Sequence, residues 1–270
     1  METLSKIRRP NIISPIVTKM ARLSPLKDGQ YHPASGATSL AIRHGSVNLI
    51  PINKENTEFI LIDAGMDKHA RKIRRHLGKL GLDLSAVKRV YITHSHPDHI
   101  RGLQALKNVP VYMSEHESRV LRGELPYEGF FPKLFDKFTK HQRANTYASI
   151  NPVIISHGYK ETVGNVNMHA MDMPGHTSGS TGYLVGKNDG SKAFDLFPGD
   201  GMDIDRHGNA RNAAPPFTAD TKISDQSITD TAEHIARLQR ANEVDIVHSV
   251  LPSHSGSGDY SSVYNYRRAA

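Results

Sequence analysis

Four side chains that commonly bind metal ions stand within six residues in the stretch YITHSHPDHIRGL, residues 91–103: they are His94, His96, Asp98 and His99. The segment KRVYIT precedes them and is predicted to be a short buried strand, so the group follows a strand end. Neutral imidazole and carboxylate are the usual ligands of zinc and similar divalent cations. The spacing therefore favours two neighbouring metal ions over a histidine cluster on the surface that binds no metal.

Further ligands must come from other parts of the chain, because one loop cannot enclose two ions. Three candidates lie after or between predicted strands, beside small or turn-forming residues: His176 in MPGHTSGS, Asp200 in LFPGDGMD and His254 in VLPSHSG. Small neighbours allow the backbone to come close to an ion. Another histidine, His248 in DIVHSV, is instead expected to pack within its strand, with support of the metal ligands as the less favoured alternative.

The composition indicates a globular chain with a sizeable core. The chain has 270 residues, of which 37% are hydrophobic and 23% charged, and its character is uniform enough for one large domain. Cysteine is absent, which excludes disulfides, thiolate metal sites and a cysteine nucleophile. The net charge of +7 is compatible with an anionic partner such as nucleic acid. A solvated basic surface is the favoured explanation.

Residues 47–81 are predicted to form two strands and a helix. VNLIPI and EFILI read as strands on either side of the turn NKEN. A helix is expected over 67–81, with Asp67 as N-cap and Gly81 as C-cap. Its apolar stripe comprises Ala70, Ile73, Leu77 and Leu80. The opposite, basic face between Lys68 and Lys79 is expected to be solvated, with a nucleic-acid role as the less favoured alternative.

The rest of the chain alternates strands and helices. PVIIS, VNMHAM, TGYLV, AFDLF and DIVHSV read as strands, 203–225 as a polar loop, and SITDTAEHIARLQR as a helix with one apolar face. This pattern predicts a layered α/β protein with the sheets in the middle. Within 118–150, the side chains Phe130, Phe131, Leu134, Phe135 and Phe138 share a helical face. They form either ordinary core or a helical cap over a pocket.

The first 35 residues are expected to be an N-terminal extension, ahead of a domain over 36–270. The basic start and short apolar patch are interrupted at Pro15, so neither a secretory signal nor a membrane span is predicted, and a cytoplasmic location is the default. The extension is either poorly ordered or an arm that packs on a membrane surface or a partner subunit, which leaves a homodimer open.

The motifs THSHPDH, GHTSGS, GDG and PSHSG, in this order between Val47 and His254, resemble those of the metallo-β-lactamase-fold hydrolase superfamily. The resemblance implies a four-layer αβ/βα sandwich with two divalent metal ions at one edge, zinc first and iron or manganese as alternatives. It also implies a role for each ligand. One ion would be held by His94, His96 and His176, the other by Asp98, His99 and His254, with Asp200 bridging both and Asp63 supporting the site from behind.

The same resemblance implies hydrolysis of a small ester, lactone or thioester by a hydroxide held between the metals, with Asp98 orienting it or carrying a proton. Antibiotic-cleaving members usually lack the bridging aspartate, so that activity is not expected. Acyl-homoserine-lactone lactonases usually carry a tyrosine three residues after this aspartate, where this chain has Asp203. A phosphodiesterase or nuclease, an iron-dependent sulfur dioxygenase and a metal-binding protein without turnover remain as alternatives.

Overall fold

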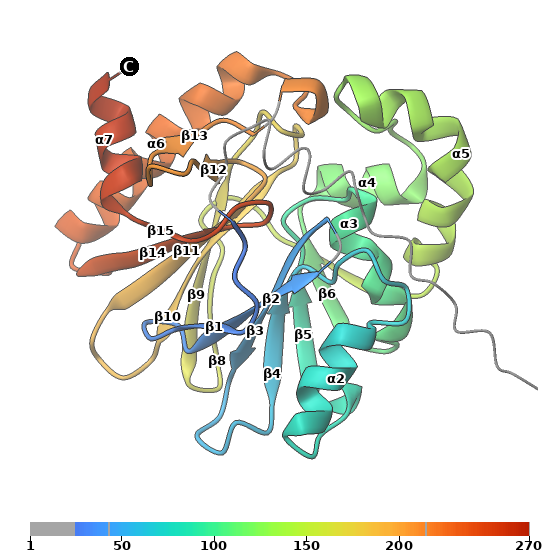
Figure 1. Ribbon diagram of the computed structural model, residues 1–270, viewed down its shortest axis with the longest axis horizontal. Coiled ribbons are helices and arrows are strands. Elements are labelled where there is room, and N and C mark those ends of the chain that lie inside the picture. The colour runs from blue at the N-terminus through green and yellow to red at the C-terminus, as the bar shows by residue number, and fades with distance from the viewer. Residues whose placement is uncertain (1–24, 43, 214, 270) are drawn as a thin grey trace, which may run out of the picture.

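The computed structural model describes residues 25–42, 44–213 and 215–269, in which two β-sheets face each other between outer helices (Figure 1). The first sheet has seven strands in the order of the chain. They are β1 (Gln30–His32), β2 (Ala37–Ile42), β3 (Gly45–Pro51), β4 (Phe59–Ile62), β5 (Val87–Tyr91), β6 (Pro110–Met113) and β7 (Asn151–Ile154). Neighbours are antiparallel as far as β4 and parallel from β4 to β7.

The second sheet has six strands in the order β15-β14-β11-β10-β9-β8. They are β8 (Lys160–Val163), β9 (Val166–Asp172), β10 (Thr181–Lys187), β11 (Ala193–Gly199), β14 (Ile246–Pro252) and β15 (Gly258–Asp259). β11 and β14 run parallel, and the other neighbours are antiparallel. As a result β9, β11 and β14 share one direction, and their carboxyl ends lie at the same edge.

Helices cover the outer face of each sheet, which gives the predicted four-layer αβ/βα sandwich (Figure 1). α6 (Thr221–Arg240) and α7 (Ser261–Ala269) lie outside the second sheet. The other side carries α2 (Arg71–Lys79), α3 (Pro97–Ile100), α4 (Glu115–Arg122) and α5 (Phe130–Tyr147), with the short 3-10 helices η1 (Leu84–Ala86) and η2 (Arg101–Ala105).

Three apolar cores hold the layers together. Along β4, Phe59 and Leu61 belong to the core outside the first sheet, whereas Ile60 and Ile62 belong to the core between the sheets. This alternation follows from the two-residue period of a strand. A third core lies between the second sheet and α6. Each side chain of this size that is fully buried stabilises the fold by roughly 1.5–3 kcal/mol.

The predicted helix after β4 is present, but it begins later than expected. α2 starts at Arg71, because Ala70 has a left-handed backbone with φ of 47°. Asp67 instead accepts hydrogen bonds from the backbone N–H groups of His69 and Arg71 in the preceding turn. Leu80, which was predicted to belong to the apolar stripe, is 51% exposed, because the helix ends at Lys79.

The predicted face of the C-terminal helix is confirmed, because Ile228, Ala232, Ile235 and Leu238 are all buried in α6. The expectation of a loop over 203–225 is wrong. The short hairpin of β12 (Asp203–Ile204) and β13 (Ala210–Arg211), the 3-10 helix η3 (Pro215–Phe217) and the first turn of α6 lie there. His248 was expected to be packed but is exposed on β14.

The segments predicted as extension and cap are only partly described. β1 lies within the expected extension 1–35 and is hydrogen-bonded to β2 as the edge strand of the first sheet. Residues 1–24 lie outside the described part of the chain. In the 118–150 segment, α5 is present and Phe130 is 66% exposed. The side chains of Phe131, Phe135 and Phe138 lie outside the described residues, so the helical cap over a pocket stays a prediction.

Among the described residues, no helix is both long and apolar enough to cross a membrane.

Candidate metal centre

All the predicted ligands come together at one edge of the sandwich, because each follows the carboxyl end of a strand. His94 and His96 follow β5, and Asp98 and His99 lie in α3 directly after them. From the second sheet, the loops after β9, β11 and β14 bring His176, Asp200 and His254. Gly199 makes the close approach of the two sheets possible, since a Cβ there would lie 2.5 Å from Cβ of Thr93.

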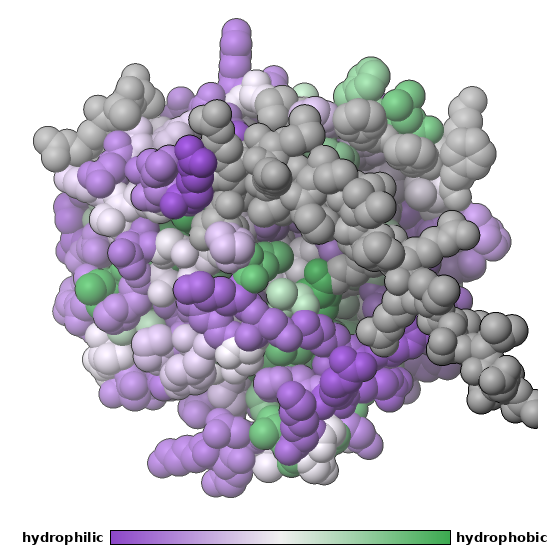
Figure 2. Space-filling view, viewed as in Figure 1, coloured by the Kyte–Doolittle hydropathy of each residue, from purple (hydrophilic) through white to green (hydrophobic). Residues whose placement is uncertain are grey.

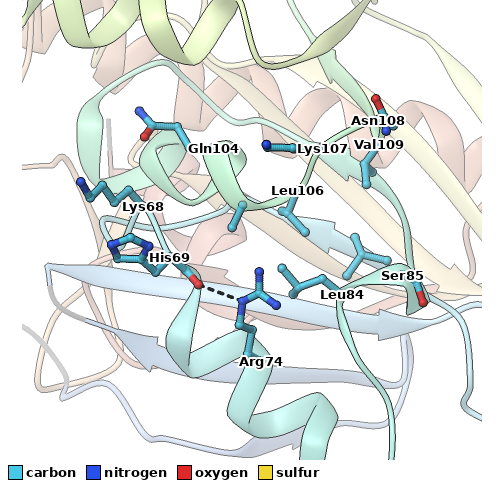
Figure 3. Close-up of a pocket in the computed structure, with 12 residues that line it drawn as sticks. Lys68, His69, Arg74, Leu84, Ser85, Gln104, Leu106, Lys107, Asn108 and Val109 are labelled. Carbon is cyan, nitrogen blue, oxygen red and sulfur yellow. Dashed lines mark hydrogen bonds between the residues drawn. The ribbon is translucent and has the colours of Figure 1, made fainter.

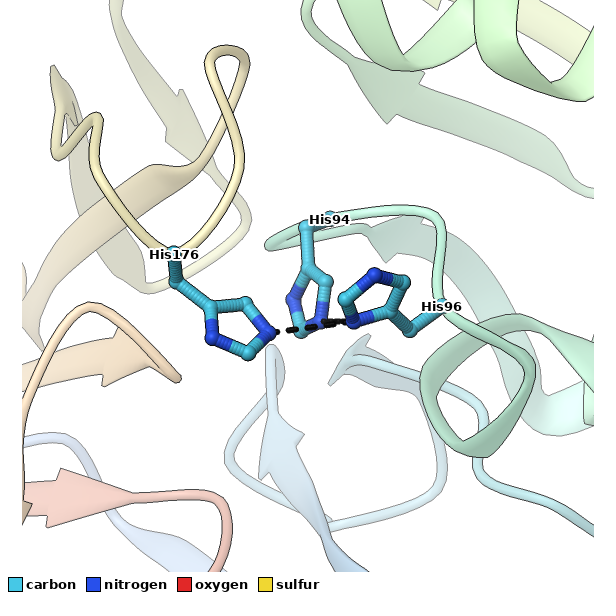
Figure 4. A group of neighbouring side chains, drawn as sticks. All are labelled: His94, His96 and His176. Carbon is cyan, nitrogen blue, oxygen red and sulfur yellow. Dashed lines mark hydrogen bonds between the residues drawn. The ribbon is translucent and has the colours of Figure 1, made fainter. Parts of the chain in front are cut away.

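Three histidines form one compact group of nitrogens. Nε2 of His94 and Nε2 of His176 each lie 3.0 Å from Nδ1 of His96 (Figure 4). All three side chains are buried, and their ring nitrogens lie within the reach of a single ion. Three imidazole nitrogens that converge on one point form a set of ligands that suits a divalent transition metal.

A second group lies beside the first and shares Asp200 with it. Nε2 of His254 lies 2.9 Å from Oδ2 of Asp200 and 3.4 Å from Oδ2 of Asp98. Nε2 of His99 lies 3.4 Å from Oδ1 of Asp200, and Nε2 of His176, from the first group, lies 3.3 Å from Oδ2. The two Asp200 oxygens therefore face both groups.

Two buried polar atoms at the centre support the fit to metal ions. Neither Nε2 of His99 nor Oδ1 of Asp200 forms a hydrogen bond within the described residues. A buried polar atom without a partner costs free energy, and native structures rarely leave one. Both atoms face the space between the two groups, where a divalent cation would satisfy them.

Burial and charge divide the histidines into two kinds. Burial lowers the pKa of His96 to about 4 and that of His176 to about 3, so both rings are neutral and can ligate at pH 7. Burial also acts to lower the pKa of His254, but the Asp200 carboxylate outweighs it and raises this pKa to about 9. Asp200 is also buried, and burial alone would raise the pKa of its carboxyl group. The charges of His254 and His99 outweigh this effect and hold the pKa well below the usual value.

Asp63 fixes the orientation of His99. It follows β4 with a left-handed backbone, φ of 61°, and is buried. Its carboxylate accepts the backbone N–H of Thr93 at 2.9 Å and faces Nδ1 of His99 at 2.8 Å. With Nδ1 donating to this carboxylate, Nε2 of His99 is the nitrogen that faces Asp200.

Glu117 of α4 is an important residue that the sequence analysis missed. Its buried carboxylate accepts the backbone N–H of Ser95 at 2.8 Å and the hydroxyl of Thr177 at 2.7 Å. It therefore joins the loop of His94 and His96 to the loop of His176. Nothing in the sequence SEHESRV distinguishes Glu117 from Glu115, which is exposed on the same helix.

Tyr127 is a second missed residue, and it closes the side of the site next to His96. Its ring lies 5.4 Å from the His96 ring, and its buried hydroxyl forms no hydrogen bond within the described residues. The guanidinium of Arg143 stacks 4.4 Å from the Tyr127 ring and pairs with Asp136 at 2.8 Å. Asp136 and Arg143 both lie in α5, so the contacts that hold α5 beside the site are the stacking of Arg143 on Tyr127 and the hydrogen bonds from its Nη1 to the backbone carbonyls of Val120 and Leu125.

Comparison with known proteins defines the family. The sequence profile of the Metallo-beta-lactamase superfamily matches residues 43–190, more than half of the chain, and the protein belongs to this superfamily. Among curated relatives, the hydroxyacylglutathione hydrolase of Acaryochloris marina (strain MBIC 11017) is 25% identical over 197 residues, which cover 68% of this chain and 65% of the relative. The probable metallo-hydrolase YflN of Bacillus subtilis (strain 168) is 28% identical over 122 residues, 41% of this chain and 46% of the relative. The chain thus spans less than two thirds of either relative.

Solved structures support the same fold. A B3 metallo-beta-lactamase with an active-site glutamic acid has a TM-score of 0.61 at 18% identity, covering 98% of this chain and 94% of that one. AidC, a dizinc quorum-quenching lactonase, has a TM-score of 0.58 at 17% identity, covering 80% and 74%. At this identity the likeness shows the fold alone.

Proposed function

We propose that the protein is a metal-dependent hydrolase that binds two divalent cations and cleaves a small ester, lactone or thioester. The observation that carries this proposal is the position of Asp200, whose carboxylate faces both groups of nitrogens. In the proposal one ion is bound by His94, His96 and His176. The other is bound by Asp98, His99 and His254, and Asp200 bridges the two.

Zinc is the proposed metal, with iron and manganese as alternatives. Imidazole suits zinc and iron, and carboxylate oxygens suit manganese as well, so this mixed donor set does not select a single ion. When bound, two such cations supply an activated water near neutral pH and polarise the carbonyl group of a substrate.

Asp98 is the residue best placed to handle a proton. Its side chain is 22% exposed, whereas that of Asp200 is 5% exposed, so Asp98 lies where the centre opens to solvent. Its Oδ2 atom lies 3.4 Å from Nε2 of His254. A carboxylate in this position can orient the attacking water and carry a proton to the leaving group, a role that typically contributes 10²–10⁴-fold to rate.

Three considerations support a small ester, lactone or thioester as the substrate. The relatives include a hydroxyacylglutathione hydrolase, and the structural neighbours include a lactonase. Within the described residues, every ion pair that Asp98 and Asp200 form is with a histidine, and none is with a lysine or arginine. A phosphodiester would need cations beside the metals, whereas a carboxylic ester needs mainly an apolar wall with a few polar groups.

The acyl-homoserine-lactone assignment is not favoured within this class. Where those lactonases usually carry a tyrosine, Asp203 is 4% exposed, and burial raises its pKa to about 6. A buried carboxyl group cannot take the place of the tyrosine hydroxyl in contacting a substrate. The proposal therefore stays with small esters, lactones and thioesters as a class.

The test is a comparison of substrates at low and high salt. A medium-chain lactone, a thioester and a chromogenic phosphodiester are assayed with the zinc-loaded protein and with the Asp98→Asn variant. Lactone or thioester turnover with little salt effect, reduced at least a hundredfold by the substitution, is expected. Turnover of the phosphodiester alone, suppressed by added salt, would overturn the proposal.

A further inference from the structure

A cavity of about 600 Å³ lies between α2 and η2, and none of its lining residues belongs to the metal-ligand groups (Figure 3). It is built from the turn before α2, from α2 itself, from η1 and β5, and from residues 104–109. Hydrophilic side chains gather where Figure 1 places α2, on the face shown in Figure 2. The volume falls within the range of small-molecule sites, about 300–1,000 Å³.

The polar part of the cavity is cationic. Lys68, Arg74 and Lys107 line it together with His69, and no acidic residue does. Among the described residues, none of these three cations forms an ion pair within 4.0 Å, in contrast to Arg71 and Lys72 of the same helix, which pair with Asp67 and Asp28.

Arg74 is held in a position that leaves its outer nitrogens available. Its Nε donates to the backbone carbonyl of His69 at 3.2 Å, and its guanidinium points into the cavity (Figure 3). Asp83, whose carboxylate interacts weakly with the charge of Arg74, already accepts both the hydroxyl and the backbone N–H of Ser85. A guanidinium fixed in this way can bind a phosphate through two parallel hydrogen bonds.

The floor of the cavity is apolar. Leu84, Val87, Leu106 and Val109 line it and belong to the core outside the first sheet. Gln104 and Asn108 also line the cavity. Nε2 of Gln104 already donates to Oγ1 of Thr146 at 3.1 Å, which leaves its amide oxygen to accept a hydrogen bond and the Asn108 amide to donate or accept one. Cations beside an apolar floor and amide groups fit a ligand that has a phosphate at one end and a planar ring at the other.

We propose that this cavity is a binding site for a small phosphorylated ligand that carries a ring, the chemistry of a nucleoside phosphate. The phosphate lies against the Arg74 guanidinium, Lys68 and Lys107 add positive charge to the lining, and the ring covers the apolar floor. The site is separate from the proposed catalytic centre, so its existence does not depend on the hydrolase proposal. Of the predicted basic face of this helix, Lys68 and Arg74 line the cavity, whereas Arg71, Lys72, Arg75 and Lys79 do not.

The test measures binding of ADP, pyrophosphate and adenosine to the metal-loaded protein by calorimetry at low salt. ADP is expected to bind at least tenfold more tightly than either fragment, because it uses both the cations and the floor. Arg74→Glu and Lys107→Glu should each weaken ADP binding at least tenfold. Arg75→Glu is the matched control: Arg75 is exposed on the same helix but does not line the cavity, and its substitution should change the affinity less than twofold.

Three results would overturn the inference. One is the absence of ADP binding by wild-type protein. A second is equal binding of ADP and one of the two fragments, which would show that half of the cavity contributes nothing. The third is tighter binding of single-stranded RNA that Arg75→Glu weakens as much as Arg74→Glu, which would make α2 an extended nucleic-acid surface. Melting temperature and metal content close to wild type show that a variant that does not bind ADP is folded.

Discussion

The carboxylate of Asp63 lies 2.8 Å from Nδ1 of His99, and this contact determines which ring nitrogen His99 presents to Asp200. The pair joins residues 36 positions apart, brought together because the parallel strands β4 and β5 end at the same edge. Support of this kind from behind a metal ligand fixes the ring and raises its basicity.

Asp63→Asn should weaken metal binding without unfolding the protein. Asparagine tolerates the left-handed backbone at this position better than most residues, so the loss is confined to the charged acceptor for His99. Metal affinity or activity should fall about 10–100-fold, measured by competition with a chromogenic chelator. Asp245→Asn, at an exposed position before β14, should leave both unchanged. An unaltered metal affinity in Asp63→Asn would show that Asp63 does not support metal binding.

Glu117→Gln should loosen the two loops that carry His94, His96 and His176. The amide oxygen of glutamine can still accept the backbone N–H of Ser95, but the amide nitrogen that would face Thr177 cannot accept its hydroxyl, so this charge-assisted hydrogen bond is lost. Loss of one hydrogen bond to a charged group costs about 1.5–3 kcal/mol, measurable as a change in the free energy of unfolding in urea. Glu115→Gln on the same helix, where the side chain is exposed and pairs with Arg122, should cost less than 1 kcal/mol. Equal effects of the two substitutions would show that Glu117 has no special role.

Asp200→Asn should cost at least one of the two ions. The change removes the negative charge that faces both groups of nitrogens and leaves the remaining ligands in place. The variant should bind at least one ion much more weakly, and ester hydrolysis should fall by orders of magnitude. Because Asp200 lies at a strand end, secondary structure measured by circular dichroism should be retained. Two tightly bound ions in this variant would require another bridging group, and Asp203 would be the first to examine.

The metal-free protein should be most stable near pH 6.5. Burial lowers the folded-state pKa of His96 to about 4 and that of His176 to about 3, so the unfolded chain binds more protons as pH falls below 6.5 and stability is lost. His254 acts in the opposite direction: its raised pKa of about 9 contributes stability below pH 6.5, and this is lost as pH rises towards 9. Urea unfolding of chelator-treated protein from pH 4.5 to 9 measures the loss of stability on the acid side and on the alkaline side of this maximum. His96→Gln should make the free energy of unfolding depend less steeply on pH below 6.5. An unchanged dependence would contradict the lowered pKa of His96.

Periodic features were predicted well from the sequence because they depend on local spacing. The buried face of α6 is one example, since Ile228, Ala232, Ile235 and Leu238 follow the helical repeat. The four-layer fold and the predicted ligands followed from the resemblance and from motifs at strand ends. The start of α2 was wrong, because a left-handed residue at Ala70 has no clear signal in sequence.

The residues that support the centre could not be predicted, because their role comes from contacts across the fold. Glu117 bonds to Ser95, 22 positions away, and to Thr177, 60 positions away, yet its sequence context is that of an ordinary surface helix. Tyr127 contacts the His96 ring and the Arg143 guanidinium, and these two residues are 47 positions apart in the sequence. The cationic cavity likewise combines residues from α2 with residues from the segment after α3.

The central claim is that the grouped nitrogens and carboxylates hold two divalent cations that hydrolysis requires. The most direct measurement is the number of zinc ions per chain, determined by elemental analysis after chelation, reloading and removal of free metal. Ester hydrolysis is followed on the same samples. The account predicts about two ions per chain, no activity in the metal-free protein, and activity that returns as the second ion binds. Protein that retains no transition metal after reloading, or that hydrolyses the ester equally well without it, would contradict the account.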